Sequence, residues 1–217
     1  MIKVLELFRG TGNLSRYFRQ RGHETFTIDW DITIEGIDLY ADIGILTAED
    51  IIERFGHPDV IWASPDCTTY SVARIGKHRR LNPITKNLDP ISEYAKFCDE
   101  VNQHVLALIE ELHPTYWFIE NPRGGLRKMK WMSELPRYTV TYCKYGEKRM
   151  KPTDIWTNHP DPQFIPPCKN GDPCHERAPR GSRTGTQGMK TKREKAKIPD
   201  KLCEHIVDIC ERGMNNE

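Results

Sequence analysis

The sequence predicts an α/β protein built on an open, doubly wound, mostly parallel sheet. Segments of strand and helix character alternate along residues 1–157, and such alternation is typical of parallel strands joined by right-handed crossovers. Four of the expected strands are followed at once by small or chemically capable residues. In sheets of this kind ligands bind beyond the carboxyl ends of the strands, so these four strand ends form the expected site.

The expected strands are short apolar runs, which cover residues 2–8, 23–29, 59–64, 115–122 and 137–146. The expected helices have apolar residues at helical spacing, and they cover residues 14–22, 46–56, 92–112 and 198–212. Thr47 and Ser92 are the N-caps expected for two of these helices. We therefore predict a catalytic core over residues 1–157, an irregular Pro-, Gly- and base-rich insertion over 158–197, and a C-terminal helix over 198–217 that returns to the core.

Composition argues against a strongly basic nucleic-acid binder and against a membrane-spanning protein. The chain has 217 residues and a formal net charge of +1, so overall charge does not indicate a nucleic-acid binder. The sequence has no run of about 18 apolar residues, so no membrane span is predicted. The seven cysteines, without an export signal, favour free thiols in the cytoplasm. Basic residues gather locally over residues 74–80, 123–130 and 190–197.

A glycine-containing loop follows the first expected strand. Gly10 and Gly12 allow the backbone to approach a ligand there. Asp29, about 20 residues further on, is placed to bind ribose hydroxyls, and Trp30 beside it could stack on a purine. The loop lacks the third glycine of the dinucleotide-binding fingerprint and has no Gly-Lys-Ser/Thr, so the expected ligand is a nucleoside without phosphates, such as S-adenosylmethionine.

Five motifs in order resemble those of the cytosine-5 DNA methyltransferases. They read VLELFRGTGNLS, IDWD, DVIWASPDCTTYS, WFIENPRGGL and YGEKRMK, within residues 2–151. The resemblance implies the Rossmann-like fold of S-adenosylmethionine-dependent methyltransferases. It also implies methylation of carbon 5 of cytosine in DNA, whether duplex or single-stranded, on a base extruded from the helix.

The resemblance assigns roles to individual residues. Cys67 is the expected nucleophile toward carbon 6 of the base, Glu120 the acid at ring nitrogen N3, and Arg149 the clamp on the carbonyl oxygen O2. The residues expected around the cofactor are Phe8, Gly10, Thr11, Gly12, Asn13, Asp29, Trp30, Asp42, Ser64 and Pro65. The residues expected at the substrate are Arg74, Lys77, Arg79, Arg80, Asn121 and Lys151.

The sequence departs from the family pattern at several points. Asp66 replaces the proline that precedes the nucleophile, and a carboxylate there should raise the pKa of the thiol unless a cation answers it, for which Arg74, Arg79 and Arg149 are the candidates. Lys151 stands at the position of the second arginine. No large target-recognition domain is present, so we expect low sequence specificity, and the basic stretch 71–90 is expected to be a mobile loop that closes over the base.

Cysteines in the expected insertion raise the question of a metal site. Cys168, Cys174 and His175 lie close in sequence, with Cys143 and Cys203 elsewhere, but their spacing is not that of a standard zinc motif. No metal is assigned, and loose thiols are the expectation. We expect a monomer whose compact size would suit a phage or mobile element.

Two other classes of function stay open. The same fold could methylate another acceptor, such as RNA, a free nucleotide or an exocyclic amine, and amine methylation would not need Cys67. A non-catalytic module could instead grip nucleic acid or a protein through the basic loops, and its binding would be indifferent to both Cys67 and S-adenosylmethionine.

Overall fold

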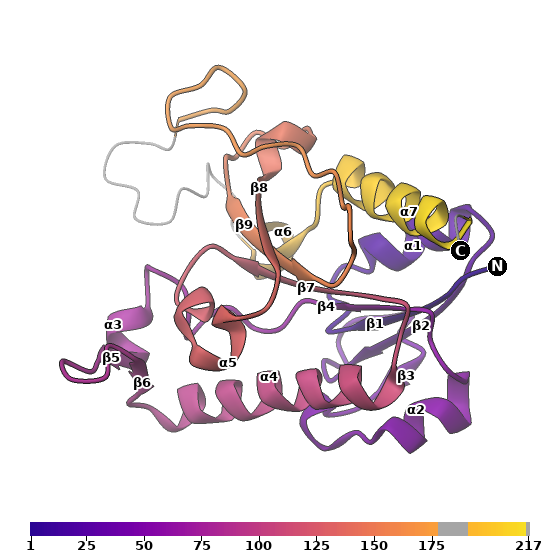
Figure 1. Cartoon of the computed structure of the whole chain (residues 1–217), viewed down its shortest axis with the longest axis horizontal. Coiled ribbons are helices and arrows are strands. Elements are labelled where there is room, and N and C mark those ends of the chain that lie inside the picture. Colours follow the sequence, from indigo (N-terminus) through magenta and orange to yellow (C-terminus); the bar gives the residue numbers. More distant parts are fainter. Residues whose placement is uncertain (178–190, 216–217) are drawn as a thin grey trace.

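A seven-stranded sheet lies between two layers of helices (Figure 1). The computed structural model describes residues 1–177 and 191–215. The strand order is β3-β2-β1-β4-β7-β9-β8. The strands are β1 (Lys3–Leu7), β2 (Glu24–Asp29), β3 (Leu39–Tyr40), β4 (Val60–Ala63), β7 (Tyr116–Pro122), β8 (Arg137–Thr141) and β9 (Pro152–Thr157). Strands β3, β2, β1, β4 and β7 pair in parallel, which confirms the predicted doubly wound fold.

Each face of the sheet has its own apolar core. On one face lie α2 (Ala48–Phe55) and α4 (Glu93–Leu112), which bury residues such as Ile51 and Val105 against the sheet. On the other face lie α1 (Asn13–Gln20) and α7 (Asp200–Asn215), whose Phe18 and Ile206 meet in the second core (Figure 1). The predicted N-caps are confirmed: the side chains of Thr47 and Ser92 accept hydrogen bonds from the backbone at the starts of α2 and α4.

The edge beyond β7 differs from the expectation. Strand β9, which was not predicted, pairs antiparallel with both β7 and β8. The strand expected over 137–146 ends at Thr141, and a 3₁₀ helix η3 (Tyr142–Tyr145) follows it. The buried Asp154 interrupts the apolar pattern of β9, and it is held there by an ion pair with Arg127. The loop between η3 and β9 is therefore turned back over the carboxyl end of β7.

The basic stretch 71–90, which was expected to be a mobile loop, has regular secondary structure. It contains α3 (Ile75–His78) and a hairpin of β5 (Arg79–Leu81) and β6 (Leu88–Pro90). Arg79 fixes the hairpin to the body, because its buried guanidinium pairs with Asp99 at 2.6 Å and also donates to the carbonyl of Thr69. Breaking a buried ion pair of this kind costs about 3–5 kcal/mol.

After β9 the chain contains neither helix nor strand over the described residues 158–177, and α6 (Lys192–Ala196) and α7 follow. Part of the predicted insertion, 178–190, and the end of the predicted C-terminal segment, 216–217, lie outside the described residues. The described part of the chain has no helix that is long and apolar enough to span a membrane.

Candidate active site

The glycine loop at the end of β1 is held by the carboxylate that ends β2. Phe8, Gly10 and Gly12 all have positive φ, at 56°, 53° and 61°, so the chain turns sharply here. The Gly10 amide donates to Asp29 Oδ2 at 2.9 Å, and the Asp31 amide donates to Asp29 Oδ1 at 3.1 Å. Asp29 therefore joins the loop after β1 to the loop after β2. At Gly12 there is little room for a larger residue, because a Cβ there would lie 2.5 Å from the Arg9 side chain.

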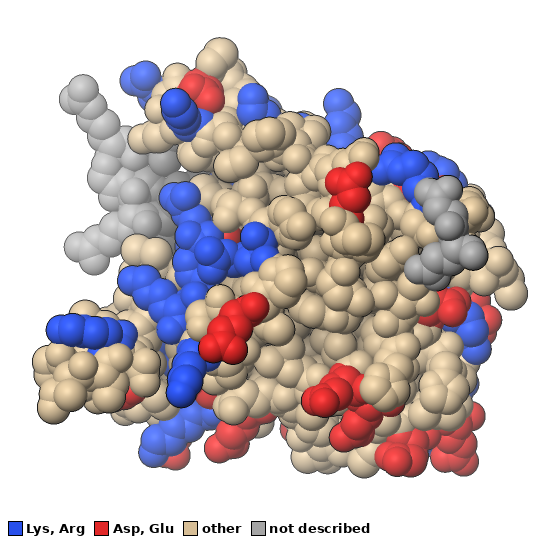
Figure 2. Space-filling model, viewed as in Figure 1, with Lys and Arg blue, Asp and Glu red and all other residues tan. Residues whose placement is uncertain are grey.

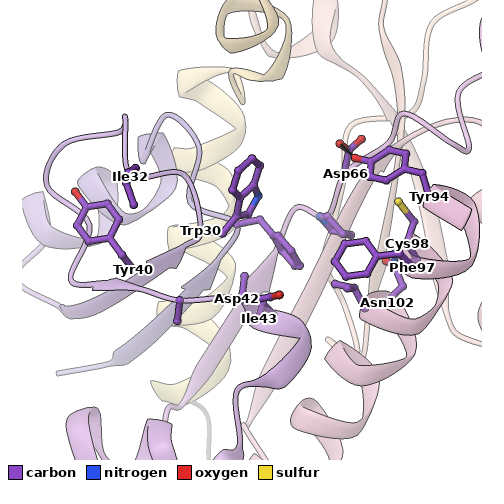
Figure 3. A pocket seen from close by; sticks show the side chains of 14 residues that line it. Trp30, Ile32, Tyr40, Asp42, Ile43, Asp66, Tyr94, Phe97, Cys98 and Asn102 are labelled. Carbon is purple, nitrogen blue, oxygen red and sulfur yellow. Dashed lines mark hydrogen bonds between the residues drawn. The ribbon is translucent and has the colours of Figure 1, made fainter.

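A pocket of about 600 Å³ opens beside this loop (Figure 3). Its volume lies in the range of small-molecule sites, which is about 300–1,000 Å³. One wall comes from the ends of β1, β2 and β3, and the other comes from α4. The lining residues are Phe8, Trp30, Ile32, Tyr40, Ala41, Asp42, Ile43, Pro65, Asp66, Tyr94, Phe97, Cys98, Val101 and Asn102.

The predicted cofactor residues differ in their positions relative to the pocket. Phe8, Trp30, Asp42 and Pro65 line the pocket, whereas Asp29 shapes the loop beside it. Ser64 accepts a hydrogen bond from the Trp62 indole at 2.7 Å, and Gly10, Thr11 and Gly12 are outside the lining. Asn13 differs from the expectation, because its buried amide donates to the carbonyl of Ile198 at 2.7 Å and to Asp200 at 2.9 Å. It fastens α1 to the start of α7.

The wall formed by α4 was missed in the sequence. Tyr94 and Phe97 point toward the pocket from its first turns (Figure 3), and they are 42% and 47% exposed. Helical spacing explained the core residues of this helix and gave no reason to examine the others. Two large aromatic side chains off the core face of a helix were the available signal, because such residues often mark a binding surface.

Cys67 lies in a tight loop after β4. Its carbonyl accepts hydrogen bonds from the amides of Tyr70 at 3.1 Å and Ser71 at 2.9 Å. The loop packs against the segment after β7, where the Gly125 amide donates to the Tyr70 carbonyl at 2.7 Å. A Cβ on Gly124 would lie 2.5 Å from the same carbonyl oxygen, so this close approach requires glycine.

Asn121 has a supporting position rather than the expected place at the substrate. Its side chain is fully buried, and its amide donates to the Pro65 carbonyl at 3.0 Å. Asn121 therefore holds the loop that carries Cys67 against β7. The sequence motif could not separate these roles, since both require an amide at the same strand end.

The environment of Cys67 raises the pKa of its thiol to about 11, chiefly through burial, with further contributions from Asp66 and Glu120. The cation that opposes this shift is Lys151, and not one of the three arginines expected in that role. Asp66 is itself partly engaged, since its Oδ2 accepts from the Tyr94 hydroxyl at 2.7 Å. The predicted conflict between a carboxylate and the thiol is thus present, and a lysine moderates it.

Glu120 and Lys151 lie close to one another, and both influence the thiol of Cys67. Glu120, at the end of β7, is 6% exposed and accepts a hydrogen bond from the Tyr142 hydroxyl at 2.8 Å. Lys151 Nζ lies 4.0 Å from Glu120 Oε1 and 4.2 Å from the centre of the Tyr142 ring. Burial lowers the pKa of the Lys151 ammonium, and the Glu120 carboxylate partly opposes that change. A buried acid, a cation and a thiol therefore share one end of the sheet.

Arg149 is held by neighbouring protein groups. It is 4% exposed, it forms an ion pair with Glu147, and it donates to the carbonyl of Lys195 at 3.5 Å. Lys151, and not Arg149, is among the main influences on the pKa of the Cys67 thiol, and the charge of Arg149 acts in turn on Lys151. The role of Arg149 at the base stays a prediction.

Exposed lysine and arginine side chains follow Cys67 closely along the chain. Arg74, Lys77 and Arg80 are exposed as expected, whereas the buried Arg79 cannot reach a substrate because Asp99 and Thr69 hold it. Figure 2 shows lysine and arginine side chains gathered between the hairpin lobe and the body, while acidic side chains collect toward the opposite, lower right of the view. A polyanion would therefore meet favourable charge near the hairpin.

The chain was compared with known proteins. No protein-family model matches it. A probable DNA (cytosine-5)-methyltransferase of Frog virus 3 is 26% identical over 227 residues, which cover 96% of this chain and 100% of that protein.

Two solved structures share the fold. A DNA modification methyltransferase encoded within an E. coli prophage matches 80% of this chain and 52% of its own length, at 18% identity and a TM-score of 0.55. The Dnmt2 methyltransferase of S. pombe matches 72% of this chain and 50% of its own length, at 17% identity and a TM-score of 0.50. The chain thus spans about half the length of these structures. The chain is thus similar in sequence, along nearly its whole length, to a viral protein named as a probable DNA (cytosine-5)-methyltransferase, and it shares its fold with two solved methyltransferases.

Proposed function

We propose that this protein transfers a methyl group from S-adenosylmethionine to carbon 5 of cytosine in DNA, with low sequence specificity. The observation that carries the proposal is the meeting of Cys67, Glu120 and Lys151 at the strand ends, next to a nucleoside-sized pocket. The viral relative, which is named for this reaction on DNA, supports the same substrate.

The pocket suits the proposed cofactor. Trp30, 67% exposed, offers an aromatic face for an adenine ring, and Asp42 offers a carboxylate in an otherwise largely apolar lining. S-Adenosylmethionine supplies an electrophilic methyl group on a positively charged sulfur. Asp66 on the rim adds negative charge that favours such a cation. Its contact with Tyr94 places this carboxylate where the two halves of the site meet.

The proposed reaction begins when the Cys67 thiolate adds to carbon 6 of an extruded cytosine. A bond forms between Sγ and carbon 6, and the electron pair of the 5,6 double bond moves to carbon 5, which would take the methyl group from the sulfonium. The S–CH3 bond breaks with its electron pair left on sulfur, so that S-adenosylhomocysteine is the leaving group. Glu120 donates to ring nitrogen N3, and Lys151 stabilises negative charge at the O2 side of the ring. Loss of the proton from carbon 5 then restores the double bond and expels the thiolate.

Low specificity is proposed because the described residues between β9 and α7 offer little with which to read a sequence. Residues 158–177 contain no helix or strand that could enter a groove. The exposed cations Arg74, Lys77 and Arg80 would contact phosphates, which position a nucleic acid without reading it. Single-stranded DNA would suit such a surface as well as a duplex would.

The test is methyl transfer from labelled S-adenosylmethionine to duplex DNA, single-stranded DNA, RNA and dCTP, with the modified nucleoside identified by mass. Cys67→Ala serves as the matched variant. We expect 5-methylcytosine in DNA from the wild type, and none from Cys67→Ala. Transfer to an amine or to RNA, or full activity of Cys67→Ala, would overturn the proposal. Cofactor binding without any transfer would instead favour the non-catalytic module.

A further inference from the structure

A compact group of three cysteines and one histidine lies outside the methyltransferase site. Cys143 belongs to η3, whereas Cys168, Cys174 and His175 belong to the irregular segment after β9. Their sulfur and nitrogen atoms all lie within 4.8 Å of one another. The seven cysteines of the chain are free thiols, so no disulfide accounts for this convergence.

The separations are those of a tetrahedral zinc site. Zinc bonds of about 2.3 Å to sulfur and 2.0 Å to nitrogen place two sulfurs about 3.8 Å apart, and a sulfur and a nitrogen about 3.5 Å apart. Cys143 Sγ lies 3.2 Å from Cys168 Sγ and 3.6 Å from Cys174 Sγ. His175 Nδ1 lies 3.6 Å from Cys168 Sγ and 3.7 Å from Cys174 Sγ. We propose that these four residues bind one structural zinc ion.

The surrounding backbone presents the ligands. The Cys168 amide donates to Thr141 Oγ1 at 3.0 Å, which ties the first ligand of the segment to the end of β8. A turn then separates Cys168 from Cys174. In it the Lys169 amide donates to Asp172 Oδ2 at 2.8 Å, and Gly171 has a φ of 96°. This turn brings the second pair of ligands back toward the first, as zinc sites require.

The fold explains why the sequence hid this site. Cys143 lies 25 residues before Cys168, on the far side of β9. The expectation of loose thiols, which rested on the spacing in sequence, did not allow for this approach of Cys143. The other cysteine considered, Cys203, is fully buried in the core near Asn13 and takes no part.

The metal would add stability to a segment that has little regular structure. Residues 158–177 have no helix or strand, and such segments are commonly held by a metal in place of a core. The site would join the segment to the loop after β8, which also carries Lys151. A backbone bond of 2.9 Å from the Glu176 amide to the Lys148 carbonyl supports the same junction. The ion is thus structural, and it takes no part in methyl transfer.

The test is the metal content of the intact protein, purified without chelators. We expect about one zinc ion per chain in the wild type and in Cys210→Ala, which alters a buried cysteine outside the group, and a loss in Cys168→Ser. Cobalt exchanged into the wild type should show the visible bands of a tetrahedral thiolate site, and this measurement needs no variant that might unfold. His175→Cys should keep the metal but change those bands.

Two results would overturn the proposal. One is a wild-type protein that neither holds zinc nor takes up cobalt. The other is a disulfide between Cys143 and Cys168, seen by mass after alkylation of the native protein, which would make the group a redox pair. Neither readout depends on methyl transfer, so the zinc proposal and the proposed function can fail separately.

Discussion

The candidate site has two parts, which differ in how far the protein itself surrounds their side chains. The cofactor side is the pocket lined by Trp30 and Ile32, and the reaction side is the end of the sheet that carries Cys67 and Glu120. On the cofactor side, Trp30 and Ile32 are 67% and 81% exposed although they are large and apolar. On the reaction side, Glu120 is 6% exposed, with Tyr142 and Lys151 as its neighbours. The reaction groups are therefore fixed before any ligand arrives, as electrostatic stabilisation requires, whereas the cofactor side gains its packing from the ligand.

The largest expected effect tests the prearranged side. Glu120→Gln keeps an oxygen that can accept from Tyr142 but removes the acid, so methyl transfer should fall about 10²- to 10⁴-fold. Cofactor affinity, measured by calorimetry, should change by less than about twofold, because the two sides are separate. Glu134→Gln, at an exposed position, is the matched control. An equal loss of cofactor affinity would show that the two sides are one unit.

The next effect concerns pH. Because the pKa of the Cys67 thiol is raised to about 11, the thiolate fraction should rise about tenfold per pH unit across the neutral and mildly alkaline range. Asp66→Asn removes a charge that raises this pKa, so its thiolate should form at lower pH. Lys151→Gln removes a charge that lowers the pKa, so its thiolate should form at higher pH. The rate of thiol alkylation against pH measures both shifts, and shifts in the same direction would contradict this account.

A third effect tests the open side. Trp30→Ala should weaken S-adenosylmethionine binding by about tenfold, since stacking on an aromatic ring is worth about 1–3 kcal/mol. The melting temperature should stay unchanged, because the side chain is largely exposed. Ile45→Ala, another exposed apolar residue outside the pocket lining, is the control. A drop in melting temperature without a change in affinity would mean that Trp30 packs for stability alone.

The smallest effect concerns the surface that borders both sides. Arg80→Ala should reduce DNA affinity by about two- to fivefold and the salt slope of binding by about 1, equally for all sequences. Arg54→Ala, exposed on α2 and away from the hairpin (Figure 1), should change neither. Filter binding at several salt concentrations distinguishes the two. A loss confined to one DNA sequence would contradict the proposed low specificity.

Sequence patterns were sufficient to predict the elements whose positions depend on hydrophobic burial alone. Continuous apolar runs marked β1, β4 and β7, because a central parallel strand is buried on both faces. They failed at β9, where Asp154 is buried by its pair with Arg127. They also failed at the hairpin, whose strands have three residues each and show no period.

The candidate site shows the same limit. The strand-end rule located Cys67, Glu120 and the glycine loop, since each lies at or just beyond the carboxyl end of a strand. It could not separate Arg149 from Lys151, because their difference depends on a loop in which Lys151 has a positive φ. Nor could it find Tyr94, whose place on the pocket wall depends on how α4 crosses the sheet.

The hydrogen bond from Asn13 to Ile198 joins residues 185 positions apart, at the two ends of the chain. Leu14 and Phe18 of α1 pack in the same core as Ile206 of α7, so the helix that follows the glycine loop is covered by a segment distant in sequence. A variant that lacks residues 198–215 would leave this apolar face of α1 uncovered, and exposed apolar surface of this kind favours aggregation and recognition by chaperones.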